Sequence, residues 1–220
     1  MYPNIKLDKD EHARDVDETR YRGIIGSLMY LTSSRPDIIQ NVGVCSRFQS
    51  KPKESHLSAV KRITRYVLGT TNYGLWFSKI DSFQLVDFCD ADFARDIIDR
   101  RSASGMCYFP EKSLIVWSSK KQATVALSTA KAEYIAASSC CSQLLCLKTQ
   151  LADYKLKVSN IPLFCDNISA INISKNPVLR SITKHIEVRF HSIREHVQNE
   201  NLDIQFVKFE DQLADISPNH

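Results

Sequence analysis

The tripeptide Phe-Cys-Asp ends two apolar stretches of this chain, at Asp90 within LVDFCDADFARD and at Asp166 within IPLFCDNISAIN. Both stretches have the length and composition of buried strands. Side chains alternate between the two faces of a strand, so Asp90 shares a face with Phe88, and Asp166 shares one with Phe164. Because ligands gather at the carboxyl ends of strands in open α/β sheets, we expect both acids at one functional edge.

Two further acids have apolar surroundings. Glu133 heads an apolar stripe on a predicted helix, and Asp215 lies between Ala214 and Ile216. Burying an unpaired carboxylate is costly unless a cation or hydrogen-bond donors compensate it. A single aspartate at a strand end is also a common turn former or helix N-cap, and Asp166, directly before NISAI, fits that role as well.

The candidate site therefore consists of four acids, namely Asp90, Glu133, Asp166 and Asp215. The sequence offers no equal set of buried lysines or arginines to neutralise them. Clustered carboxylates repel one another and are usually held together by divalent cations, and oxygen-only ligands suit Mg²⁺ or Mn²⁺. Two such ions carry out phosphoryl transfer, one by generating hydroxide and the other by stabilising the leaving oxygen. We therefore expect a two-ion site.

The elements that position these acids are predicted from hydrophobic periodicity. Residues 1–20 are polar and are expected to be flexible or extended. Residues 21–80 are mainly helical, and in their last helix Leu57, Val60 and Ile63 recur every three residues on one face.

Short strands are then predicted at YGLWFSK (73–79), FQLVDFCD, SGMCYF and LIVWSS. A long helix follows, from an N-cap at Ser128 to about Tyr154. Strand IPLFCD, helix NISAINISKN, helix IEVRFHSIREHVQN, strand LDIQFVKF and a terminal helical start, EDQLADI, complete the chain. This order predicts an α/β fold, a mixed five-stranded sheet with its parallel strands in the second half, flanked by helices.

The composition is that of an ordinary globular protein, with 43% hydrophobic and 25% charged residues among 220. The net charge of +4 is only weak evidence for a polyanionic binding partner. No apolar run reaches the length of a membrane span, so we expect no membrane partner. Seven cysteines without paired C-x-x-C motifs favour reduced, mostly buried thiols over a zinc site.

Several motifs in order resemble the ribonuclease H domain of copia-type LTR retrotransposon Pol polyproteins: FCDADFA, WSSKKQATVALSTAKAEYIAAS, LFCDNISAINISKNPV, TKHIEVRFHSIRE and EDQLADI. Upstream, YRGIIGSLMYLTSSRPDI and HLSAVKRITRYVLGTTNYGLWFSK resemble the segment that joins reverse transcriptase to that domain. The resemblance divides the chain into a flexible N-terminus (1–20), this connection (21–80) and a ribonuclease H-like domain (81–220). It covers nearly the whole chain.

The resemblance implies hydrolysis of the RNA strand of an RNA–DNA hybrid, with Asp90, Glu133 and Asp166 as the core metal ligands and Asp215 completing the second metal site. The implied cofactor is Mg²⁺ or Mn²⁺, as two ions. The implied partners are the hybrid and the reverse transcriptase portion of the same polyprotein, in a cytoplasmic retroelement particle or in the nucleus. Five basic residues are candidates for phosphate contacts, although a solvated surface explains them equally well: Lys120, Lys121, Arg180, Lys184 and Arg189.

The chain also departs from the family pattern. The polymerase palm with its aspartates is absent, so we expect no polymerase activity. Phe93, Ala94 and Arg95 replace the usual Trp-Ala-Gly, and Ser217-Pro-Asn-His follows ADI where the family continues into a last helix. Pro218 is incompatible with a helix interior, which predicts a frayed stub around Asp215. The alternative function is therefore a catalytically inactive retroelement remnant or a co-opted module that binds nucleic acid or a partner.

Overall fold

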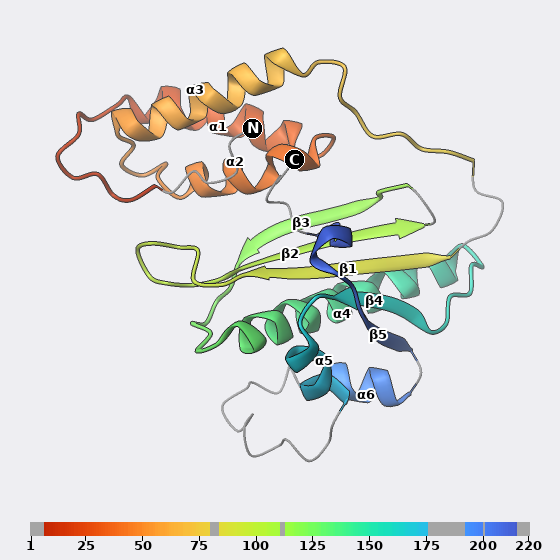
Figure 1. The fold of residues 1–220 in the computed structure, drawn as a ribbon. Helices are drawn as coiled ribbons and strands as arrows, with labels where there is room; N and C mark the ends of the chain where they lie inside the picture. Colours follow the sequence, from red (N-terminus) through yellow and green to blue (C-terminus); the bar gives the residue numbers. More distant parts are fainter. Residues whose placement is uncertain (1–6, 80–83, 111–112, 176–191, 200, 215–220) are drawn as a thin grey trace.

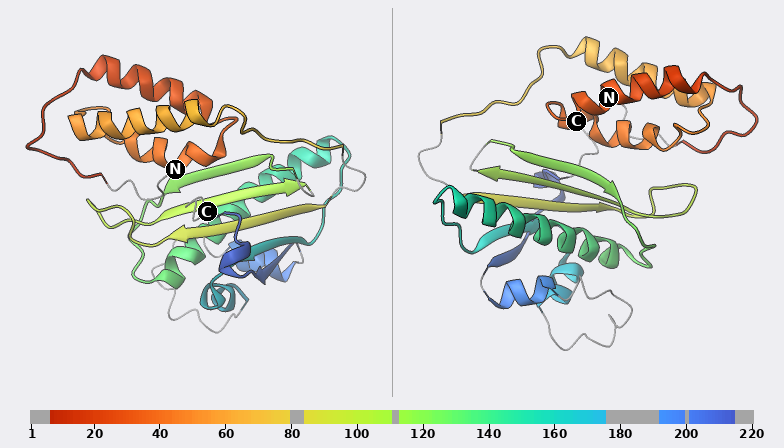
Figure 2. Two further views of the ribbon diagram at one scale, coloured as in Figure 1. Left: turned by 45° about the horizontal axis from the view of Figure 1, so that its top comes forward. Right: turned by 180° about the vertical axis from the view of Figure 1, so that it is seen from behind.

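The structure is a computed structural model that describes residues 7–79, 84–110, 113–175, 192–199 and 201–214. Its elements form three layers (Figure 1). A helical unit lies over one face of a five-stranded sheet, near β3, and three further helices cover the opposite face. Figure 2 shows the same arrangement from two further directions, with a long connection running from the helical unit to the sheet.

The helical unit contains α1 (Glu18–Leu31), the 3-10 turn η1 (Pro36–Ile38), α2 (Ile39–Ser46) and α3 (Glu54–Gly69). The predicted periodicity of α3 is confirmed, because Leu57, Val60 and Ile63 are buried against α1 and α2 in a core of their own.

The N-terminal stretch is described from residue 7 onward. Helix α1 begins at Glu18, and Asp17 caps it by accepting a hydrogen bond of 2.7 Å from the Arg20 backbone N–H. Upstream of the helix, Asp15 pairs with Lys53 at 2.7 Å, and the Asp8 carbonyl contacts His56 Nε2 at 2.8 Å. The described part of this stretch, from residue 7, is thus tied to α3.

The sheet contains β1 (Leu85–Asp92), β2 (Ala103–Pro110), β3 (Val116–Lys121), β4 (Ile161–Cys165) and β5 (Leu202–Phe206), in the order β3-β2-β1-β4-β5. β1, β2 and β3 pair antiparallel, whereas β4 is parallel to both β1 and β5. The predicted mixed five-stranded sheet, with its parallel strands in the second half, is confirmed.

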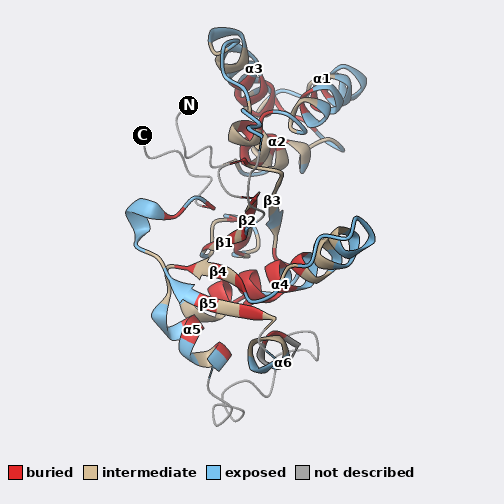
Figure 3. Cartoon of the chain, turned by 90° about the vertical axis from the view of Figure 1, so that its right-hand side faces the viewer, coloured by how far each residue is buried: buried red, intermediate tan, exposed pale blue. Residues whose placement is uncertain are grey.

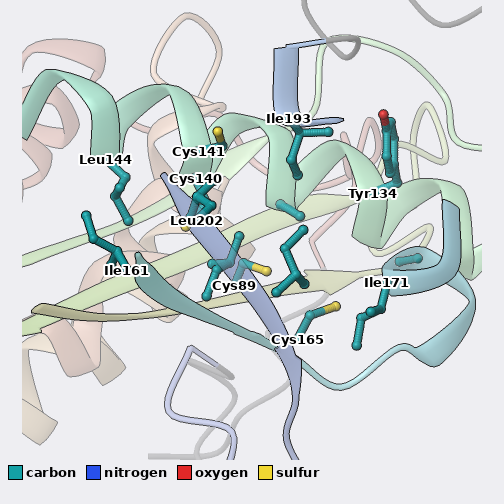
Figure 4. Packing of buried hydrophobic residues seen from close by; sticks show 14 of the residues in the cluster. Cys89, Tyr134, Cys140, Cys141, Leu144, Ile161, Cys165, Ile171, Ile193 and Leu202 are labelled. Atoms are coloured by element: carbon teal, nitrogen blue, oxygen red, sulfur yellow. The ribbon is translucent and has the colours of Figure 1, made fainter. Parts of the chain in front are cut away.

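The other face of the sheet packs against α4 (Thr129–Asp153), α5 (Ile168–Lys175) and α6 (Ser192–Gln198). As predicted, Ser128 caps α4, accepting a hydrogen bond of 3.2 Å from the Lys131 backbone N–H. The α4 stripe that Glu133 heads packs on β1 and β4, where Cys140 and Leu144 meet Ile161 in the main core (Figure 4). Figure 3 shows buried residues gathered in this layer and, separately, within the helical unit.

Two sequence predictions are wrong. Residues 73–79 form no strand, and Trp76 in this connection is 84% exposed. The aromatic residues there mimic a strand pattern but have no neighbouring strand to pair with. The predicted terminal helical start is, in its described part, a 3-10 turn at Phe209–Asp211 followed by extended backbone at Gln212.

Contacts between side chains and backbone join the helical unit to the sheet. Trp117 on β3 donates its indole N–H to the Thr32 carbonyl after α1, at 2.9 Å. Arg47, directly after α2, pairs with Asp96 in the loop between β1 and β2 at 2.5 Å. The helical unit is therefore held against β3 and this loop.

Candidate active site

The pairing of β1 with β4 brings the two Phe-Cys-Asp copies side by side. Phe88 lies opposite Phe164 in the parallel register, and their ring centroids are 5.0 Å apart. The same register carried two residues further places Asp90 beside Asp166, where β4 has already ended at Cys165. The repeated tripeptide therefore lies on two adjacent strands, near the end of β1 and at the end of β4.

Glu133 reaches this edge from the second turn of α4. Its Oε1 accepts a hydrogen bond of 3.1 Å from the Ala91 backbone N–H on β1. The side chain is only 5% exposed, and Oε2 has no hydrogen-bond partner among the described residues. A buried carboxyl oxygen without a partner is costly, and a cation would compensate it.

The electrostatics of this edge are those of a crowded acidic cluster. Burial, followed by the charge of Asp90, raises the pKa of Glu133 to about 10. Burial likewise raises the pKa of Asp166 above its usual range. Without a cation, Glu133 is therefore protonated at neutral pH, and a divalent cation would favour its ionised form.

Three side chains at this edge offer ligand atoms that all lie within 4.8 Å of one another, those of Glu133, Cys165 and Asp166. Two of the four predicted acids are thus brought together. Asp90 lies outside this group of three, although its charge acts on Glu133 and on Cys165. Asp215 lies outside the described residues.

The segment leading to Asp215 does lie over the same strand. Gln212 donates a hydrogen bond of 2.9 Å to the Cys89 carbonyl on β1 and is buried. Ala214 lines a small hollow together with Asp90 and Asp92.

Sequence reasoning missed the participation of Cys165, which it treated as an interior thiol. Six of the seven cysteines are indeed buried, and all are free. The available signal was position, because Cys165 ends β4 immediately before Asp166 and so shares the site edge. Periodicity places this thiol on the α4 side of the sheet, from which Glu133 also approaches.

Asp87 was also not identified from the sequence as a buried acid. It is fully buried on β1, and its Oδ2 accepts a contact of 2.9 Å from the Cys140 thiol. Burial raises its pKa well above the usual range. Because Asp87 lies two residues before Cys89, on the face that packs on α4, it belongs to the core.

The predicted basic residues differ in their surroundings. Lys120 is exposed on β3, whereas Lys121 is engaged by Asp96 at 2.8 Å and by Asp99 at 2.7 Å. Arg180, Lys184 and Arg189 lie outside the described residues.

The turn after β1 contains the Phe93-Ala94-Arg95 sequence that departs from the family pattern. An ion pair forms within this turn. Arg95, in the place of the family glycine, pairs with Asp92, and Ala94 adopts a positive φ of 51°. A positive φ is strained for a residue with a Cβ, so glycine would be the unstrained choice at this turn.

The strand order, with an antiparallel half joined to a parallel half and helices on both faces, matches a ribonuclease H-like fold. Strong homologues of the chain, matching it over nearly its whole length, are copia-type retrovirus-related Pol polyproteins from transposons. It is 39% identical over 216 residues to the retrovirus-related Pol polyprotein from transposon RE1 of Arabidopsis thaliana, and 41% identical over 207 residues to that from transposon TNT 1-94 of Nicotiana tabacum.

These two matches cover 98% and 94% of this chain but only 15% and 16% of the relatives. The chain is also 44% identical, over 119 residues, to a protein named secreted RxLR effector protein 161 from Plasmopara viticola, covering 54% of this chain and 84% of that protein. No protein-family model matches the sequence.

Solved structures with some likeness include an LC11 ribonuclease H1 in complex with an RNA/DNA hybrid, at a TM-score of 0.42 and 15% identity. That match covers 59% of this chain and 89% of the other. In the described parts of the chain, no helix combines the length and the apolar character needed to cross a membrane.

Proposed function

We propose that this chain is a retrotransposon ribonuclease H-like domain that hydrolyses the RNA strand of RNA–DNA hybrids with two divalent ions. The observation that carries the proposal is the buried, unsatisfied Oε2 of Glu133 beside Asp166 and within the electrostatic reach of Asp90. Homology to Pol polyproteins and the ribonuclease H-like topology support it.

The residues present fit divalent cations. Asp90, Glu133 and Asp166 would hold them, with Asp215 as the fourth ligand. When bound, Mg²⁺ or Mn²⁺ ions supply a nucleophilic hydroxide and stabilise the leaving oxygen. The Ala91 N–H binds one oxygen of Glu133, and the other oxygen, which has no partner among the described residues, would be available to a cation. Burial of Glu133 keeps bulk water from screening its charge, whereas Asp90 and Asp166 are only partly buried.

The partners and compartment follow as part of the same proposal. The substrate is an RNA–DNA hybrid, and the reverse transcriptase portion of the polyprotein is a second partner through the helical unit. The reaction takes place in a cytoplasmic retroelement particle or in the nucleus.

A second candidate function is a module that binds without cleaving. It is favoured by the position of Asp90 outside the group of three ligand atoms. The similarity to a protein named as a secreted effector is a further reason to keep it, since a related sequence then occurs in a protein that is not named as a Pol polyprotein.

The test is cleavage of an end-labelled RNA–DNA hybrid by the purified chain in Mg²⁺ and in Mn²⁺. The parent should cut the RNA strand, and Asp90→Asn or Asp166→Asn should reduce the rate at least about a hundredfold, because each loses a metal ligand worth several kcal/mol. Asp153→Asn, at an exposed acid on the last turn of α4, is the matched control and should cleave like the parent.

Equal cleavage by the parent and both ligand variants would contradict the assigned site. Hybrid binding by a folded parent that never cuts would establish the second candidate.

A further inference from the structure

Cys165 gives the acidic cluster a soft ligand that a magnesium site does not need. Its sulfur and the carboxyl oxygens of Glu133 and Asp166 lie within 4.8 Å of one another. Mg²⁺ prefers oxygen, whereas thiolates select zinc and similar cations. Because Asp166 is only half-buried, the group is open to solvent on one side.

The Cys165 thiol is hydrogen-bonded to the Cys89 thiol, whereas one oxygen of Glu133 has no partner among the described residues. Cys165 Sγ lies 4.0 Å from the Asn167 carbonyl, at the limit of a sulfur hydrogen bond, and adjoins the Cys89 thiol on β1. The Ala91 N–H holds Glu133 by Oε1. Oε2 belongs to a side chain that is 5% exposed and has no partner among the described residues. The thiol of Cys165 and a buried carboxyl group with one unpartnered oxygen are therefore close neighbours.

We propose that Glu133, Cys165 and Asp166 form a three-ligand site for a thiophilic divalent cation, Zn²⁺ or Cd²⁺, which excludes the catalytic ions. One sulfur and two oxygens with a fourth position open to water suit tetrahedral coordination. Ligand atoms around such an ion lie roughly 3.3–3.7 Å apart, so atoms that lie within 4.8 Å of one another need to approach by at most about 1.5 Å on binding. The cation replaces the protons of the thiol and of Glu133, which pass to the buffer.

The consequence for activity rests on the proposed function, because inhibition requires an active ribonuclease, whereas cation binding does not. Binding is therefore measured directly. The metal-free full chain is titrated with Cd²⁺ while the ultraviolet thiolate-to-cadmium charge-transfer band is recorded. The parent should saturate with one Cd²⁺ per chain, and Cys165→Ser should lose the band.

Two other cysteines provide matched controls. Cys146 is exposed, and Cys89 is buried beside Cys165 but outside the group of three. Cys146→Ser and Cys89→Ser should both keep the band. Loss of the band in Cys146→Ser, or its persistence in Cys165→Ser, would overturn the proposal.

Glu133→Gln is a second test of the site. Because it keeps every thiol, it remains informative if Cys165→Ser does not fold. It should weaken Cd²⁺ binding at least roughly tenfold, the loss that even an outer partner of a metal ligand causes. Unchanged affinity would overturn the site. Cleavage in Mg²⁺ without any cadmium band would contradict this inference alone, whereas an intact band without cleavage would contradict only the proposed function.

Discussion

At the scale of single residues, the unusual feature is acid burial without cationic partners. Glu133 and Asp87 are both buried, each has one carboxyl oxygen without a partner among the described residues, and both have raised pKa values. Only Glu133 lies where a cation has access, beside half-buried Asp166. A buried carboxyl oxygen without a partner is thus interpreted as part of a ligand site at Glu133 and as part of the core at Asp87.

Asp87 is predicted to make stability depend on pH. Its folded pKa is raised above the unfolded value of 3.8, so the unfolded chain releases a proton that the native chain keeps, and stability falls as pH rises above about 4. Asp87→Asn, which retains an acceptor for Cys140, should raise the free energy of unfolding at pH 8 by about 1–3 kcal/mol. Urea unfolding at pH 4 should show little difference, and an equal gain at both pH values would contradict this explanation.

Glu133 should couple stability to divalent cations. Mn²⁺ at a hundred times its dissociation constant should stabilise the parent by about 2.7 kcal/mol, seen as a higher Tm. Glu133→Gln should be more stable than the parent in EDTA at neutral pH, because it removes a buried acid with a raised pKa, and should gain little from Mn²⁺. The same Mn²⁺ shift in both chains would rule out Glu133 as a ligand.

At the scale of elements, the site depends on where β4 stops and where α4 starts. Strand β1 continues to Asp92, whereas β4 ends at Cys165, four residues beyond Ile161. The resulting opening lets Glu133 reach the Ala91 N–H. Helix α4 must therefore begin at a defined residue to deliver its second turn to that opening.

The N-cap of α4 should make a measurable contribution. Ser128→Ala removes the hydrogen bond from the Lys131 N–H and should lower the free energy of unfolding by about 1 kcal/mol. Ser139→Ala, on the exposed side of the same helix, is the control and should be neutral or slightly stabilising. Thermal melting of both variants checks the difference, and equal melting temperatures would indicate that the cap is not needed.

At the scale of the whole molecule, the helical unit and the sheet domain have separate cores, joined by polar contacts. Asp96 is central to the junction. Its side chain is 5% exposed and pairs with Arg47 from the helical unit and Lys121 from β3. Although burial raises the pKa of Asp96, the hydrogen bond from Lys121 and those from two backbone N–H groups hold it below its usual value.

Asp96→Asn should therefore weaken the junction in a pH-dependent way. A lowered folded pKa contributes stability above the unfolded value of 3.8 and loses it as pH falls. The variant should lose about 1–3 kcal/mol at pH 7 and almost nothing at pH 3, measured by urea unfolding. Asp153→Asn serves again as the control, and a loss of the same size at pH 3 would point to packing rather than charge.

The sequence by itself determined the order of elements, the helical periodicity of α3 and α4, the mixed sheet and the resemblance to Pol polyproteins. These follow from local patterns, because alternation and 3.6-residue spacing are properties of neighbouring residues. Residues 73–79 show the limit, since a strand needs a partner that local composition cannot supply.

Only the tertiary structure decided which acids meet. Alternation placed Asp90 and Asp166 near strand ends, but the tertiary structure grouped Asp166 with Glu133 and Cys165 and left Asp90 outside that group. It also separated Glu133, beside a solvent opening, from Asp87, sealed within the core. These distinctions depend on packing between segments more than 40 residues apart, as the contact between Ala91 and Glu133 shows, and no local pattern encodes them.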